Sequence, residues 1–133
     1  MFNFIFRKIR ITRKRVVRKK RTNKEYAALR EQARQVVHER LEHFNKHYGF
    51  TYQKVFIKDQ KSRWGSCSSK GNLNFNYRIA TLPPELQDYL IVHELCHLGQ
   101  MNHSAEFWKL VEQTIPNYRD YDTRLKHMKM RSP

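Results

Sequence analysis

The stretch His93-Glu94-Leu95-Cys96-His97 decides how this chain is interpreted. Two histidines four residues apart on a helix project from the same face, because each residue turns the helix by about 100°. Both imidazoles can therefore bind one metal ion. The carboxylate that follows the first histidine lies beside that ion, where it can take a proton from a metal-bound water. This pattern is typical of the metal-binding helix of zinc hydrolases.

The helix around this motif is apolar on all sides. Between Tyr89 and Leu98 the only polar residues are His93, Glu94 and His97, and a helix with such a pattern is buried against its neighbours. An unpaired charge in that setting costs several kcal/mol. A metal ion and its water supply the missing partners, so the burial favours a metal site.

A third ligand is expected just beyond this helix. His103 follows a turn at 99–102 that can bring it back over the helix face, and Glu106, one turn into the next helix, competes with it. We favour His103 because it lies at a turn rather than inside a helix. Neutral imidazoles and tetrahedral geometry suit one Zn²⁺ per chain, with the fourth position open to a reacting water.

Glu94 is the expected catalytic base of such a site. Zinc lowers the pKa of a bound water from about 15.7 to near 7, and Glu94 would accept the proton and pass it to the leaving group. A further group must stabilise the oxyanion. Arg63, Tyr77 and Arg78 are the candidates, and they would also contact the substrate.

The remaining sequence predicts one α+β domain around the motif helix. Thr22-Asn23-Lys24-Glu25 has the spacing of a capping box, and apolar residues then recur every three or four positions until Gly49, which predicts a long helix. A strand is expected over 53–58 and an antiparallel hairpin over 62–79, whose second arm alternates apolar residues with asparagines. That alternation predicts one apolar and one polar face, and the asparagines of the polar face either meet a polar partner or form an ordinary solvated surface.

Three helices are expected after the hairpin. Pro84 can sit in the first turn of the motif helix. Ser104 can cap the next helix, which Pro116 ends, and the tail predicts a last short helix with Leu125 inward.

The positive charge is concentrated at the N-terminus. The chain has 27 Lys and Arg against 12 Asp and Glu, and residues 1–24 hold eleven of the basic residues and no acidic one. We therefore divide the chain into a basic arm, 1–21, and a domain, 22–133. Residues 7–24 are a predicted contact for nucleic acid or an anionic surface.

The composition favours a cytoplasmic protein. The two cysteines, Cys67 and Cys96, make no disulfide framework, and Cys96 lies about 100° round the helix from His97, so both are expected to be small buried hydrophobes. The apolar run 2–6 precedes the basic residues, the reverse of a secretory signal, and is too short for a transmembrane segment.

Five sequence motifs occur along the chain in the order found in the YgjP-like metal-dependent hydrolases, and through these motifs the chain resembles that family. They are Arg63-Trp-Gly-Ser-Cys67, Asn72-Leu-Asn-Phe-Asn-Tyr-Arg78, Leu82-Pro-Pro-Glu85, His93-Glu-Leu-Cys-His97 and Asn102-His-Ser-Ala-Glu-Phe-Trp108. The resemblance covers about residues 50–125. These small zincin-type proteins are described as metallopeptidase-like, and some as UTP pyrophosphatases. Members usually have a longer strand-rich segment before the long helix.

The resemblance implies a minimal zincin-like fold, in which a short antiparallel sheet packs on the buried motif helix with flanking helices. It also implies His93, His97 and His103 as metal ligands and Glu94 as catalytic base.

Two classes of function stay open on the sequence. The first is a zinc hydrolase acting on peptides, laid along a strand of the hairpin, or on nucleotides such as UTP, which would need cations such as Lys61, Arg63, Lys70 and Arg78 near the metal. The second is a nucleic-acid-associated zinc protein that works through the basic arm, either with a structural zinc or as a tethered protease resembling the SprT-like proteins.

Overall fold

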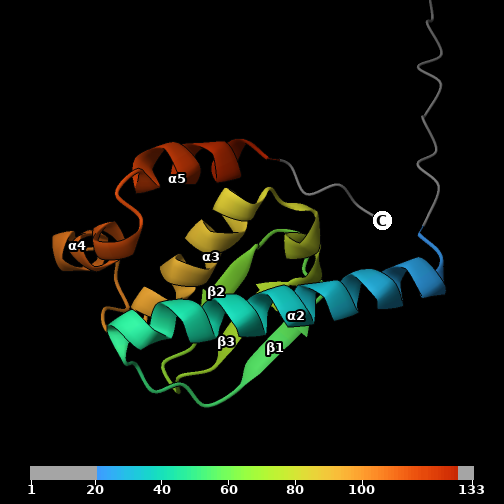
Figure 1. Ribbon diagram of the computed structural model, residues 1–133, viewed down its shortest axis with the longest axis horizontal. Helices are drawn as coiled ribbons and strands as arrows, with labels where there is room; N and C mark the ends of the chain where they lie inside the picture. Colours follow the sequence, from blue (N-terminus) through green and yellow to red (C-terminus); the bar gives the residue numbers. More distant parts are fainter. Residues whose placement is uncertain (1–20, 129–133) are drawn as a thin grey trace, which may run out of the picture.

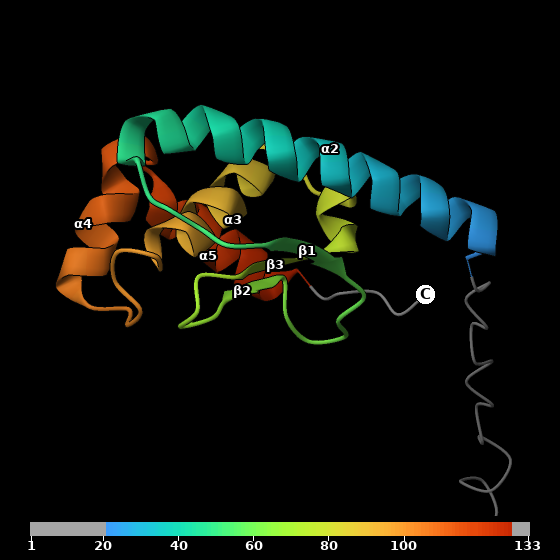
Figure 2. The same ribbon diagram turned by 90° about the horizontal axis from the view of Figure 1, so that it is seen from below.

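The helix that carries the histidine motif lies at the centre of the fold. In the computed structural model, which describes residues 21–128, this helix (α3) contacts strand β2 and the three other α-helices. Figures 1 and 2 show α2 crossing one side of α3, the small sheet below it, and α4 and α5 on the remaining sides. The elements are α2 (Asn23–Tyr48), β1 (Val55–Lys58), β2 (Gly65–Cys67), β3 (Leu73–Asn76), the 3-10 helix η1 (Tyr77–Thr81), α3 (Pro84–Cys96), α4 (Ala105–Thr114) and α5 (Tyr118–His127).

Both ends of α2 follow the predicted signals. The Thr22 hydroxyl accepts from the backbone N–H of Glu25 at 3.1 Å, and the Glu25 carboxylate accepts from the Thr22 N–H at 2.8 Å, so the capping box is confirmed. Gly49 ends the helix in the left-handed conformation, with φ of +68°. The buried stripe of this helix consists of Ala33, Val37, Leu41 and Phe44.

The sheet is mixed, with β3 in the centre and the order β1-β3-β2. The hairpin of β2 and β3 is antiparallel as predicted, with Gly65 opposite Phe75. β1 instead runs parallel to β3, with Val55 opposite Leu73. The expectation of a wholly antiparallel sheet therefore needs this correction. β3 enters between β1 and β2, which run in opposite directions, so it can be antiparallel to only one of them.

Of the two interpretations of the polar face of β3, an ordinary solvated face is contradicted, because all four residues of this strand are buried, and contact with polar groups is supported. The Asn76 side chain donates to the carbonyl oxygens of Gln60 at 2.6 Å and Arg63 at 2.9 Å. Its own oxygen accepts from the N–H of Arg78 at 3.0 Å. The asparagine thus holds the loop before β2 over the sheet and starts η1, which is why the strand ends at Asn76 rather than at residue 79.

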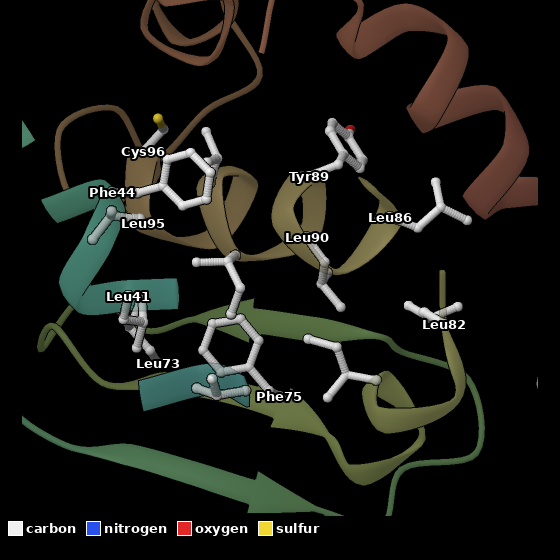
Figure 3. Close-up of a cluster of buried hydrophobic side chains, with 14 of the residues drawn as sticks. Leu41, Phe44, Leu73, Phe75, Leu82, Leu86, Tyr89, Leu90, Leu95 and Cys96 are labelled. Carbon is white, nitrogen blue, oxygen red and sulfur yellow. The ribbon is translucent and has the colours of Figure 1, made fainter. Parts of the chain in front are cut away.

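The core lies where α3 meets the sheet and α2. Figure 3 shows Leu90 of α3 pointing toward Phe75 of β3, and Tyr89 pointing the other way, toward α5. Both α3 residues are at most 3% exposed. The predicted burial of the motif helix on most of its sides is confirmed.

The last two helices also begin and pack as expected. The Ser104 hydroxyl accepts from the N–H of Phe107 at 3.4 Å and caps α4, and Leu125 is the buried residue of α5. Among residues 21–128, no helix is both long and apolar enough to cross a bilayer. The predicted basic arm, 1–21, lies outside the described residues except for Arg21, whose guanidinium donates to the Tyr77 hydroxyl at 3.1 Å.

We expect Asn76→Ala to destabilise the protein by about 2–4 kcal/mol, because it leaves buried carbonyl groups of the preceding loop without their donor. Urea unfolding measures this change. Asn72→Ala is the matched control: it lies in the turn before the same strand, is only half-buried, and should cost less than about 1 kcal/mol. Equal losses in the two variants would contradict the role given to Asn76.

Candidate metal centre

The structure brings His93, His97 and His103 together. Their three Nε2 atoms form a nearly equilateral triangle with sides of 3.3, 3.1 and 3.2 Å. His93 lies in the last turn of α3, His97 caps that helix, and the turn after it places His103 back over the same face. Among the described residues, these three are the group that could share a metal ion. Glu106, the competitor at the sequence level, is exposed and is not part of this group.

The triangle fits one tetrahedral ion. Ligand atoms 2.0–2.1 Å from such an ion are about 3.3 Å from one another, close to all three observed separations. Imidazole nitrogens at this spacing, all aimed at one centre, cannot satisfy each other by hydrogen bonding, because each N–H would point at the shared centre rather than at a lone pair. A cation is the natural common partner of the three lone pairs.

Contacts behind the triangle fix how His93 is protonated. The Tyr89 hydroxyl donates to the Asp122 carboxylate at 2.8 Å, and the same oxygen lies 3.2 Å from Nδ1 of His93. Since its single hydrogen is directed at the acceptor-only carboxylate, the hydroxyl oxygen accepts from Nδ1–H. The proton of neutral His93 is thereby held at Nδ1, and Nε2 keeps its lone pair for a metal.

The other two histidines are also held in place. Nδ1 of His97 donates to the carbonyl oxygen of Gln100 at 3.0 Å, which leaves its Nε2 lone pair facing the triangle. The His103 ring stacks on Trp108 of α4 with ring centres 5.9 Å apart. Burial lowers the pKa of His93 to about 3 and also lowers the pKa of His97, so both rings are neutral near pH 7.

Glu94 lies beside the triangle with an unused oxygen. Its side chain is nearly fully buried, and Oε2 has no hydrogen-bond partner among the described residues. Burial raises the pKa of the Glu94 carboxyl to about 8. In the metal-free protein, such a carboxyl can hold or release a proton around neutral pH.

Glu94 has this position because Gly65 has no side chain. A Cβ on Gly65 would lie 3.1 Å from Cγ of Glu94 and 3.0 Å from the carbonyl oxygen of Asn74. Strand β2 can therefore lie directly against the carboxylate. The close packing of β2 against Glu94 thus explains the glycine in the motif Trp64-Gly65-Ser66, an explanation that the sequence alone did not reveal.

Two cavities meet at the histidines. One has a volume of about 390 Å³ and the other about 350 Å³. Both are lined by Arg63, Gly65, His93, Glu94 and His103. From these shared residues the larger cavity extends to α5 and the first half of α3, and the smaller one follows β2 and the end of α3.

Of the three predicted substrate residues, only Arg63 lies at the cavities. Tyr77 is fully buried and packs edge-on against Tyr26, and Arg78, 3% exposed, pairs with Asp59 at 3.0 Å. Neither Tyr77 nor Arg78 lines either cavity. Their contacts stabilise η1 and the loop before β2, so the structure gives them a place in the core instead of at the substrate.

Two residues behind the triangle were missed at the sequence level. Tyr89 lies four residues before His93 and therefore on the same helix face, a spacing that could have identified it. Asp122 comes from α5, and no local pattern links it to the motif. Cys96 is buried as predicted, whereas Cys67 is only partly buried and lines the smaller cavity.

Comparisons with known proteins show similarity to metallopeptidases. The YgjP-like metallopeptidase domain matches residues 4–128, a range that includes most of the basic segment. Abylysin from Pyrococcus abyssi, solved as a metallopeptidase zymogen, is 26% identical with a TM-score of 0.62, over 72% of this chain and 99% of that one. The jannalysin zymogen from Methanocaldococcus jannaschii is similar in fold, at 23% identity and a TM-score of 0.51, over 71% of this chain and 91% of that one. A search of curated proteins gave no match.

We expect Tyr89→Phe to weaken metal binding 10–100-fold, because the His93 ring loses the acceptor that holds its proton at Nδ1. Competition with a chromophoric chelator measures the affinity. Tyr121→Phe is the control, since Tyr121 packs near Tyr89 without contacting the histidines. An unchanged affinity in Tyr89→Phe would show that this hydroxyl does not orient the ligand.

In the metal-free protein, Glu94→Gln should become increasingly more stable than wild type as the pH rises. The folded-state pKa of Glu94, about 8, lies above its ordinary value of 4.5. Its stabilising contribution is therefore complete below pH 4.5 and is lost as the pH rises through 8, whereas glutamine does not ionise. The difference should reach a few kcal/mol by pH 9. Thermal unfolding in chelator at pH 5 and pH 9 measures it, and a difference independent of pH would contradict the burial of the carboxylate.

Proposed function

The chain belongs to the YgjP-like family of metallopeptidase domains, and on that premise we propose that it is a zinc-dependent peptidase. In this proposal His93, His97 and His103 hold the ion and Glu94 is the general base. One observation carries it: the Glu94 carboxylate, whose buried Oε2 has no partner among the described residues, has its other oxygen 4.0 Å from Nε2 of His93, one of three imidazole nitrogens spaced for one tetrahedral ion. A structural site would need a fourth protein ligand, whereas among the described residues three side chains, all histidines, lie close enough together to share one ion.

Each residue of the centre has a defined part in peptide hydrolysis. Bound zinc would supply a lowered pKa for the attacking water and polarisation of the scissile carbonyl. The Glu94 carboxylate would accept the proton of the attacking water and deliver it to the leaving nitrogen. Tyr89 and Asp122 keep Nδ1 of His93 protonated throughout, so this histidine does not compete for the transferred proton.

The substrate chain has a place along β2. Among residues 21–128 this strand is at the edge of the sheet and pairs only with β3, and its three residues line the smaller cavity or both cavities. A peptide added beside β2 would hydrogen bond to an unpaired strand edge and pass over the histidines. Gly65, where β2 touches Glu94, would then lie next to the bond that is cleaved.

The distribution of cations favours a peptide over a nucleoside triphosphate. Of the four cations that a nucleotide site would use, only Arg63 lines the cavities. Arg78 is buried on Asp59, and Lys61 and Lys70 lie elsewhere on the surface. Lys126 lines the larger cavity but is paired with Asp122 at 2.8 Å. Among the described residues, a triphosphate at the cavities would therefore meet little unpaired positive charge.

We expect zinc-loaded Glu94→Gln to bind one zinc per chain and to cleave peptides at least 100-fold more slowly than wild type, because the proton acceptor is gone while the ligands remain. Metal analysis and cleavage of casein and of a fluorogenic peptide library measure both properties, with UTP assayed in parallel. If the protein hydrolyses UTP and no peptide, the proposed peptidase activity is wrong and the protein is a nucleotide hydrolase.

The matched control is Glu106→Gln, which removes the glutamate that the sequence offers as an alternative third ligand. It should keep both zinc and activity, whereas His103→Ala should lose zinc. The reverse result, zinc lost in Glu106→Gln and kept in His103→Ala, would assign the third ligand to Glu106.

A further inference from the structure

We propose that the larger cavity is a specificity pocket that receives a large apolar or aromatic side chain of the peptide, next to the bond that is cleaved. This inference rests on the proposed peptidase function. It adds a substrate class and the residues that select it.

The position of the cavity places such a side chain at the reacting centre. His93, Glu94 and His103 line one part of its wall, and the cavity continues from there toward α5. A side chain inside it therefore belongs to a residue directly beside the scissile bond. It would lie on the Trp64 side of Gly65, whereas the smaller cavity follows Ser66 and Cys67 on the other side.

The walls of this pocket are mainly apolar and come from four parts of the fold. They are Trp64 before β2, Tyr89 and Leu90 of α3, Trp108 of α4 and Leu125 of α5. A volume of about 390 Å³ lies within the range of about 300–1,000 Å³ typical of pockets that enclose ligands. A phenyl or indole ring can therefore fit, and burial of its apolar surface favours binding.

The charged groups of the wall are already engaged. One oxygen of Asp122 pairs with Lys126 at 2.8 Å and the other accepts from the Tyr89 hydroxyl at 2.8 Å. A charged substrate side chain would find no unpaired partner among the described residues deep in the pocket and would lose its hydration. Arg63 is exposed and lies where the two cavities meet, not at the α5 end.

The smaller cavity differs in the residues that it does not share. These are Ser66, Cys67, His97 and Met101, without an aromatic hydrocarbon ring. The selection for a large apolar side chain is accordingly expected on one side of the scissile bond only.

The two tryptophans of the chain allow occupancy to be measured directly. The sequence contains only Trp64 and Trp108, and both line this pocket. Intrinsic fluorescence of full-length, zinc-loaded Glu94→Gln therefore reports on binding without cleavage. The probes are blocked pentapeptides that differ only at the central residue: Phe, Leu, Ala, Asp or Lys.

We expect the Phe and Leu peptides to bind at least 10-fold more tightly than the Ala, Asp and Lys peptides. Equal affinities, tighter binding of a charged peptide, or no saturable binding by any peptide would overturn the proposal. Cleavage of the same peptides by the wild-type protein distinguishes failure of the pocket proposal from failure of the proposed peptidase function. Selective binding without cleavage would support the pocket and contradict the peptidase, and cleavage without selectivity would contradict the pocket alone.

Two variants test whether the wall of the larger cavity is responsible for the selectivity for an apolar side chain. Trp64→Ala should reduce the Phe-to-Ala affinity ratio to below about 3-fold, read from the remaining Trp108. Phe56→Ala is the matched control, because Phe56 is an exposed aromatic residue on β1, at the opposite edge of the sheet. Trp64→Ala with an undiminished ratio would show that the ring binds elsewhere.

Discussion

The structure depends on one constraint: α3 must stay buried although it brings three ionisable side chains into the core. Burial alone pushes each of them toward its neutral form, lowering the pKa of His93 and raising that of Glu94. A cation at the three Nε2 atoms changes this balance, because it takes up the lone pairs of the neutral rings and favours the ionised carboxylate beside them. The low-dielectric surroundings destabilise the metal-free chain. In the metal-loaded protein the same surroundings strengthen the attraction between the cation, the imidazole nitrogens and the Glu94 carboxylate.

The rest of the fold keeps this arrangement in register. Gly65 lets β2 lie against the Glu94 carboxylate, and Asn76 anchors the loop that leads into that strand. From the other side, α5 reaches His93 through the hydrogen bonds that join Asp122 to Tyr89 and Tyr89 to His93. The sheet edge, the loop before it and the last helix thus position side chains on the same two turns of α3. They also form the walls of the cavities, so the groups that orient the metal ligands and those that would select a substrate side chain are neighbours.

Features that depend on local sequence were predictable. The capping box at Thr22, the left-handed Gly49 and the Ser104 cap follow from interactions within one turn, and each is present. The histidine motif and the approach of His103 depend on helix geometry plus a short turn. Features that depend on contacts distant in sequence were not predictable: the parallel pairing of β1 is set by the insertion of β3, and Asn76 of β3 is buried because it binds the carbonyl groups of a separate loop. The burial of Tyr77 and Arg78 also depends on distant contacts, since η1 turns both side chains into the core and away from the two cavities.

X-ray absorption at the zinc edge of the loaded protein tests the central claim most directly. Our account predicts three imidazole nitrogens and one oxygen at about 2.0–2.1 Å, with no sulfur bound to the metal. A sulfur scatterer near 2.3 Å would make Cys67 or Cys96 a ligand, and fewer than three imidazoles would remove one histidine from the triangle. Either result would contradict the three-histidine centre.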